Sequence, residues 1–133
     1  MQITGAKLTK WQEKLLTQAI QISADFIQQK YHLEIDIKEL ITIRCSNTCR
    51  FAYYTQGKGL IRLNLKATSI RLYDKKTLGN YPTQVKGGFL HSYVCQLIHE
   101  MTHLVQDIED RCYSEVETTR NELEYLRSIN LIK

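Results

Sequence analysis

Residues 99–103 read His-Glu-Met-Thr-His inside an amphipathic stretch, and no other segment constrains this chain as strongly. On a helical wheel with His99 at 0°, seven apolar residues fall between roughly 140° and 260°. His99 and His103 lie at about 0° and 40°, on the opposite face. The pattern therefore predicts a helix over 89–108 that buries one face and carries two imidazoles side by side on the other. The seven apolar residues are Val94, Leu97, Ile98, Met101, Leu104, Val105 and Ile108.

Two histidines four residues apart on a helix can bind one zinc ion, because their imidazoles are one turn apart on the same side. Glu100 stands between them, where its carboxylate can take a proton from a water molecule that zinc activates. Two imidazoles combined with a carboxylate favour Zn²⁺ over Mg²⁺ or Ca²⁺. The plainer alternative is a pair of exposed surface histidines.

The third ligand is predicted to be a carboxylate, because no histidine follows the motif. Glu115 and Glu117 point about 200° apart on a helix over 114–130, so only one of them can face the histidine pair. The apolar side of that helix is the side of Glu115, which makes Glu115 the predicted ligand and Glu117 the alternative. Ser114-x-x-Glu117 also has the pattern of a capping box. Glu122 shares the inward face and is expected to orient a histidine or to be a further candidate ligand.

The remaining segments predict a small α+β domain. Apolar residues at helical spacing predict one long amphipathic helix over 8–31. Three short strand-like runs, 41–45, 50–54 and 60–65, are separated by turn residues and predict a small antiparallel three-stranded sheet. Residues 67–87 carry little periodic signal and are expected to be mostly loop. The full 133 residues provide for one domain.

Composition limits the partners and the compartment. The formal net charge is only +4, so a nucleic-acid partner is possible but not supported. No apolar run is long enough to cross a bilayer, and the first ten residues lack the apolar block of a secretory signal. A cytoplasmic protein with reduced thiols is expected. Cys45 and Cys49 are interpreted as small buried residues, while Cys95 lies one turn before His99 and Cys112 suggests no role.

The motif and the carboxylate on the following helix resemble the gluzincin zinc metallopeptidases. The compact layout is similar to the minigluzincins and to SprT-type and phage-encoded metallopeptidase domains, and the resemblance covers roughly residues 35–130. Glu115-x-Glu-Thr-Thr resembles the family pattern Glu-x-x-Ala-[Asp/Asn/Tyr], with Thr118 in place of Ala and Thr119 in the last position. A SprT-type domain would also bring a third histidine, which this sequence lacks.

The resemblance implies hydrolysis of peptide bonds in a peptide or protein substrate, which would lie along an edge strand at 60–65. A tyrosine or histidine is expected to stabilise the oxyanion that forms, with Tyr53, Tyr54, His91 and Tyr113 as candidates. Asp107 is expected to support the site or to be solvated. The rival hypothesis is a catalytically silent module of the same fold that docks protein or nucleic acid. The zinc content of the protein would separate the two.

Overall fold

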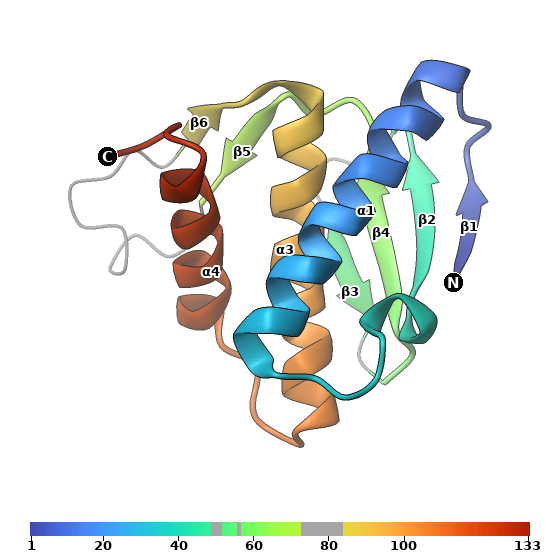
Figure 1. Ribbon diagram of the computed structural model, residues 1–133. Helices are drawn as coiled ribbons and strands as arrows, with labels where there is room; N and C mark the ends of the chain where they lie inside the picture. Colours follow the sequence, from blue (N-terminus) through green and yellow to red (C-terminus); the bar gives the residue numbers. More distant parts are fainter. Residues whose placement is uncertain (49–51, 56, 73–83) are drawn as a thin grey trace.

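Helix α3 (Gly88–Ile108), which carries the His-Glu-Met-Thr-His motif, lies at the centre of the computed structural model. It contacts helices α1 (Lys10–Tyr31) and α4 (Glu115–Ser128) and strands of both sheets (Figure 1). The structure describes residues 1–48, 52–55, 57–72 and 84–133. The chain is a mixed α and β fold, as the sequence predicts.

Helix α1 begins and ends at well-defined caps. The hydroxyl of Thr9 accepts a hydrogen bond from the backbone N–H of Gln12, whose side chain accepts one from the N–H of Thr9. His32 ends the helix in the left-handed conformation at φ 51°. None of the helices in the described part of the chain is long and apolar enough to span a membrane.

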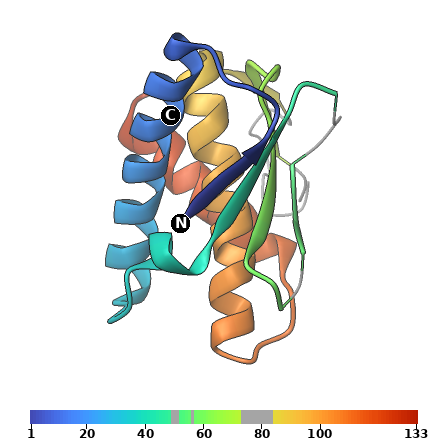
Figure 2. The ribbon, with the colours of Figure 1, turned by 90° about the vertical axis from the view of Figure 1, so that its right-hand side faces the viewer.

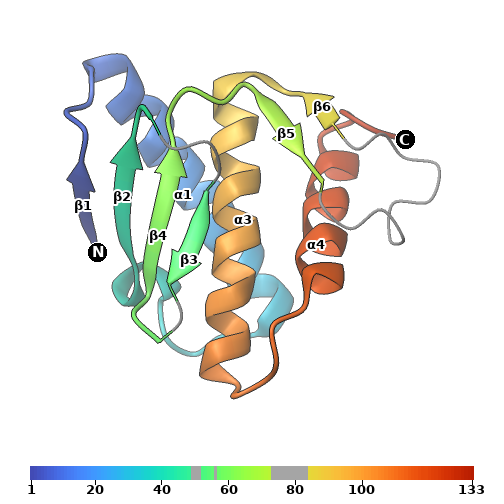
Figure 3. The ribbon, with the colours of Figure 1, turned by 180° about the vertical axis from the view of Figure 1, so that it is seen from behind.

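The main sheet has four strands in the order β1-β2-β4-β3 (Figure 3). Their bounds are β1 Gln2–Gly5, β2 Thr42–Ser46, β3 Tyr53–Thr55 and β4 Leu60–Asn64. Strands β1, β2 and β4 run parallel to one another, and only the β3–β4 pair is antiparallel. Helices α1 and α3 lie on the same side of this sheet (Figure 2).

The prediction of an antiparallel three-stranded sheet is therefore wrong in its pairing and its strand number. The turn at 57–59 does join an antiparallel pair, but β2 pairs with β4 rather than with β3. Strands β2 and β4 each bury two alternate apolar residues, so placing them side by side forms one continuous apolar surface under the helices. The inward residues are Ile43 and Cys45 in β2, and Ile61 and Leu63 in β4.

Two further strands lie in the segment predicted to be mostly loop. Strands β5 (Ser69–Arg71) and β6 (Gln84–Lys86) pair in an antiparallel two-stranded sheet next to the start of α3. Each strand has only three residues, too few for an alternating pattern to stand out. The 3-10 helix η1 (Ile37–Leu40) connects α1 to β2.

The edge of the sheet nearest to α3 is β3, not the 60–65 strand. Strand β4 lies between β2 and β3, so its backbone is paired on both sides. The expectation that 60–65 is an edge strand along which a substrate lies is therefore wrong, and the edge beside α3 is β3. Residues 50–51 of the predicted second strand lie outside the described residues.

Candidate metal centre

The two histidines and the acid of the motif are all buried on α3. The exposed fractions are 7% for His99, 4% for Glu100 and 5% for His103. Exposed surface histidines are therefore excluded. Six of the seven apolar residues predicted for the buried face of α3 lie in the core, whereas Ile108 at the end of the helix is 48% exposed. Helix α4 packs against α3 beside the imidazoles.

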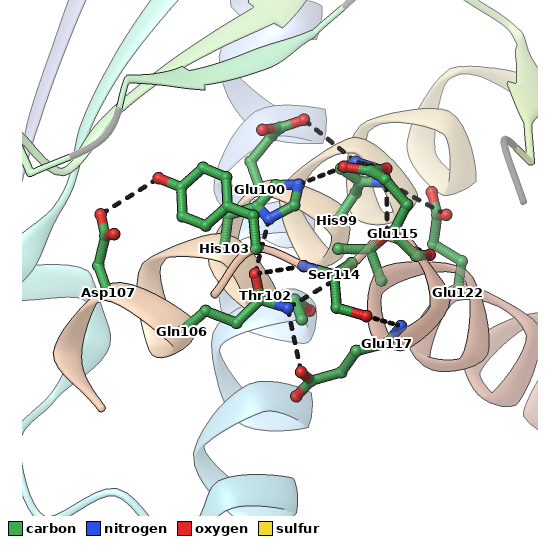
Figure 4. A network of polar contacts seen from close by, with 12 residues as sticks. His99, Glu100, Thr102, His103, Gln106, Asp107, Ser114, Glu115, Glu117 and Glu122 are labelled. Carbon is green, nitrogen blue, oxygen red and sulfur yellow. Dashed lines mark hydrogen bonds and ion pairs between the residues drawn. The ribbon is translucent and has the colours of Figure 1, made fainter. Parts of the chain in front are cut away.

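Glu115, the first residue of α4, reaches both imidazoles from across the helix pair (Figure 4). Its Oε1 lies 2.8 Å from His103 Nε2, and its Oε2 lies 3.1 Å from His99 Nε2. One ligand atom from each of the three residues lies within 4.8 Å of the other two. Two ligands of a tetrahedral zinc ion, bound at about 2.1 Å, are about 3.4 Å apart, so the three side chains fit one metal ion.

The carboxylate of Glu115 and the two imidazoles shift one another's pKa values. Hydrogen bonds to His103 and His99 hold the pKa of Glu115 far below its usual range. Burial acts to lower the pKa of His103, but the hydrogen bonds to Glu115 and Gln106 outweigh it, and the pKa is raised. The ionised carboxylate of Glu115 thus favours the protonated, positively charged form of the imidazoles. A divalent cation bound between the three side chains would provide positive charge in place of these protons.

Each imidazole is oriented through its second nitrogen. Glu122 Oε2 lies 3.4 Å from His99 Nδ1, and Gln106 Oε1 lies 2.9 Å from His103 Nδ1. An acceptor at Nδ1 keeps the hydrogen there, so Nε2 can offer its lone pair to a metal. The role predicted for Glu122 as an orienting group agrees with this contact.

The sequence did not identify Gln106 as part of the site. Three hydrogen bonds fix the orientation of its side-chain amide. Its Nε2 donates to Glu117 Oε1 at 3.0 Å and to the Ser114 carbonyl at 3.2 Å, while its Oε1 accepts from the Ser114 N–H at 3.3 Å. These bonds leave the Oε1 of Gln106 facing His103. Its place one turn after His103 on α3 is the only signal that the sequence offers.

The helical wheel predicts that Glu117 points away from the domain, and this prediction is wrong. It accepts hydrogen bonds from both terminal nitrogens of Arg111, at 2.8 and 3.0 Å, and from Tyr31 at the end of α1. The guanidinium of Arg111 lowers the pKa of Glu117 to about 2. Asn121 donates to Tyr31 Oη at 2.8 Å, which extends the network across three helices. The structure thus places Glu115 against the imidazoles, while Glu117 links α4 to α1.

The capping box predicted at the start of α4 is only half formed. The Ser114 hydroxyl accepts from the Glu117 N–H at 3.3 Å, but the Ser114 N–H donates to Gln106. Thr118, which replaces the Ala of the family pattern, donates to the Glu115 carboxylate at 3.4 Å. The Thr119 hydroxyl is buried and has no hydrogen-bond partner among the described residues, so it supports no ligand.

Glu100 lies beside the cluster of His99, His103 and Glu115 but is not one of the three candidate metal ligands. Its Oε1 lies 3.7 Å from His99 Nε2. Burial raises the pKa of Glu100 to about 7, although the charges of His99 and His103 oppose the shift. A carboxylate with this pKa can accept a proton near neutral pH and release it again.

Asp107 supports the site rather than being merely solvated. Its Oδ2 accepts from Tyr54 of β3 at 2.6 Å, from the Gly57 N–H at 2.9 Å and from Tyr113 at 3.3 Å. The Tyr113 ring stacks on His103, with centroids 4.6 Å apart. This single carboxylate connects the edge strand, the turn after it and the loop before α4 to helix α3.

Contacts separate the four candidates for stabilising an oxyanion. His91 Nδ1 lies 2.8 Å from Tyr125 Oη, and both Tyr54 and Tyr113 donate to Asp107, Tyr54 at 2.6 Å and Tyr113 at the longer distance of 3.3 Å. Tyr113 is 40% exposed and lies against His103. The Tyr53 side chain lies outside the described part of the structure.

The cysteines agree with the interpretation as thiols where they are described. Cys45, Cys95 and Cys112 are free, and the first two are buried. Burial raises the pKa of the Cys45 thiol to about 11, as expected of a packing residue. Cys49 lies outside the described residues.

Comparison of the chain with protein-family models, with curated proteins and with solved structures finds no match in any of the three. The side chains of the site therefore carry the functional conclusion on their own.

Proposed function

We propose that this protein is a zinc-dependent peptidase of the gluzincin type, in which His99, His103 and Glu115 hold the metal and Glu100 is the general base. The observation that supports the proposal most directly is the convergence of these three side chains from two helices, with the buried carboxylate of Glu100 beside them. Two imidazoles and one carboxylate form a ligand set that zinc prefers, with a further coordination position open.

Bound zinc would polarise a substrate carbonyl and lower the pKa of water toward neutrality. Glu100 would take the proton of that water as it attacks the carbonyl, and would then pass the proton to the leaving amine. The buried carboxylate of Glu100 lies 3.7 Å from His99 Nε2, next to the position where both transfers would take place. Tyr113, stacked on His103, would turn its hydroxyl from its long hydrogen bond with Asp107 and donate it to the oxyanion.

The substrate would approach along β3. This strand is the sheet edge that Asp107 holds next to the metal-binding helix through Tyr54. An extended peptide can pair with the open edge of such a strand, which brings its carbonyl groups past the site. The outer edge at β1 lies on the far side of β2 and β4 and offers no such contact with α3.

The test is to measure metal content and hydrolysis in the same preparations. We expect near-stoichiometric zinc and cleavage of a mixed peptide pool by the unaltered protein. Glu100→Gln is expected to keep the zinc and lose cleavage, whereas His99→Ala is expected to lose both.

His91→Ala is the matched control, because it removes a histidine from the same helix at a position that contacts Tyr125 instead. It should retain both zinc and activity. Zinc that survives His99→Ala, or cleavage that survives Glu100→Gln, would contradict the proposed mechanism. Purified protein that holds no zinc and cleaves no peptide would point to the silent binding module instead.

A further inference from the structure

Acidic residues are nearly missing from the part of the chain that forms β2 to β6. Between Glu39 and Glu100 the sequence contains nine Lys or Arg residues but a single acidic residue, Asp74, which lies outside the described residues. All other acidic residues precede or follow this segment, on the helices and the loops next to them. The strand segments are therefore strongly positive, although the net charge of the whole chain is only +4.

Four of these cations lie around β4, on or next to the face of the main sheet that is turned away from the helices (Figure 2). Strand β4 buries the residue on each side of Arg62, so Arg62 faces outward, and the same alternation in β2 turns Arg44 outward. Lys58 and Lys66 are exposed in the turns before and after β4. Together the four residues form the basic face: Arg44, Lys58, Arg62 and Lys66.

The charges of the basic face are not balanced by nearby acids. Arg44, Lys58 and Lys66 form no ion pair with any residue that the structure describes. Arg44 and Arg62 are register partners on neighbouring parallel strands, about 4.8 Å apart. Like charges at such positions destabilise a sheet. A carboxylate bound between the two guanidinium groups would offset this repulsion and accept hydrogen bonds from both.

The basic face adjoins the edge along which the substrate is proposed to lie. Strand β3 pairs with residues 60–62 of β4. Lys58 lies at one end of this strand pair, where its N–H donates to the Thr55 carbonyl at 3.2 Å. Lys66 lies beyond the other end of β4, whose five residues span about 17 Å. Cations therefore lie at both ends of the strand pair that provides the substrate edge.

An extended peptide that pairs with β3 adds one strand to the sheet, and every second side chain of the peptide then lies on the outward side. The peptide backbone is two strand spacings, or about 10 Å, from β4. Because the Debye length is also about 10 Å at 0.1 M salt, the attraction between Arg62 and an acidic side chain of the peptide is only partly screened. Arg71, exposed on β5, borders the opening beside His99 and Glu100 and extends the positive charge to the metal centre.

We infer that the basic face binds acidic side chains of the substrate, so that this peptidase acts on acidic segments of polypeptides. The inference rests on the proposed function, since it requires the substrate to follow the β3 edge. A nucleic acid would be attracted by the same charges. The acidic polypeptide is favoured because the basic face continues into the strand edge beside the metal centre.

The first experiment digests a peptide pool with the zinc-loaded protein and reads the residues on both sides of each cleaved bond by mass spectrometry. Asp and Glu should be enriched near the bond. The best substrate is then synthesised with its acidic residues either kept or replaced by their amides. The acidic form should have a kcat/KM about tenfold higher at about 0.02 M salt but less than about twofold higher at about 1 M salt, where the Debye length is about 3 Å.

The variant that tests the basic face combines three substitutions of exposed cations: Arg44→Gln, Lys58→Gln and Lys66→Gln. It should cleave the amide peptide as fast as the unaltered protein does and lose the preference for the acidic peptide. The matched control removes three exposed cations from helices α1 and α4, with Lys10→Gln, Lys14→Gln and Arg120→Gln together, and should keep the preference. Equal cleavage of both peptides by the unaltered protein, or equal losses in the two variants, would overturn the inference while leaving peptidase activity in place.

A binding measurement separates failure of the basic face from failure of the catalyst. Fluorescence anisotropy of the Glu100→Gln protein uses labelled peptides of about twelve residues in which Ala alternates with Glu, Gln or Lys, so that an extended chain presents all its charges on one side. The Glu peptide should bind about tenfold more tightly than the Gln peptide at low salt, and the three substitutions should remove this difference, even if the unaltered protein cleaves nothing. Equal affinity for the three peptides, or tighter binding of a labelled oligonucleotide than of the Glu peptide, would overturn the inference.

Discussion

The buried carboxyl group of Glu100 should make the metal-free protein less stable as the pH rises. Burial raises its pKa from the usual 4.5 to about 7. An acid with a raised pKa in the folded state binds a proton that the unfolded chain has already released, so folding is favoured at low pH. Stability is then lost as the pH rises through the interval between the two pKa values.

Glu100→Gln removes this pH dependence because an amide does not titrate and has nearly the same shape. A shift from 4.5 to about 7 corresponds to about 3 kcal/mol at about 1.36 kcal/mol per pKa unit. Between pH 5 and pH 8.5, the variant should gain about 2–3 kcal/mol on the unaltered protein. Any constant cost of the substitution cancels in this difference.

The assay is urea unfolding of chelator-treated protein at a series of pH values. With a slope of about 2 kcal/mol per molar urea, the midpoint of the variant should move by about 1 M relative to the unaltered protein across this pH range. Glu34→Gln, at an exposed position, is the control and should change by less than about 0.5 kcal/mol. Curves for Glu100→Gln and the unaltered protein that stay parallel from pH 5 to pH 8.5 would refute the reasoning.

Three further predictions concern metal affinity and turnover. Glu115→Gln should lower zinc affinity more than about 100-fold and Glu117→Gln less than about 10-fold in a chelator competition, since only the former loses a ligand; equal losses would contradict the assignment. Gln106→Ala should lower zinc affinity by about 10–100-fold in the same assay, and an unchanged affinity would remove its orienting role. Tyr113→Phe should lower kcat by about 10–100-fold with KM unchanged, whereas the control Tyr54→Phe should leave kcat within about threefold. A raised KM with unchanged kcat in Tyr113→Phe would instead assign Tyr113 to substrate binding.

The helices and the cluster that they bring together follow from local patterns in the sequence. The motif determines where His99 and His103 lie on α3, because the helical repeat alone sets their separation. Glu115 is also predictable, since its direction on α4 follows from the apolar face of that helix. Both arguments use one helix at a time, and helical periodicity is the most reliable signal in a single sequence.

The sheet could not be predicted in the same way, because its pairing is a property of segments far apart in the chain. The sequence shows that β2 and β4 alternate apolar and polar residues, but it does not show that they are neighbours. Strand β1 is exposed along its whole length and therefore lacks a buried pattern. Assigning the substrate edge to 60–65 was wrong for this reason, since an edge is defined only by the pairing.

Glu117 shows why the support of the site was also missed. Its position on a helical wheel points it away from the apolar face of α4, but the end of α1 lies there and places Tyr31 beside it. A wheel describes the face of one helix and says nothing about which polar side chain another helix brings. The polar partner decides the role of Glu117.

The same network connects the precision of the metal centre to contacts well outside the motif. Gln106 orients His103 and is itself oriented by Glu117 and by the backbone of Ser114, which immediately precedes the candidate ligand Glu115. One set of hydrogen bonds thus determines both the direction of an imidazole and the place where α4 begins. Because ligand positions matter to within about 0.5 Å in a designed catalytic or binding site, the contact of Glu117 with Tyr31 of α1 is expected to support the arrangement of the three candidate ligands without being essential to it.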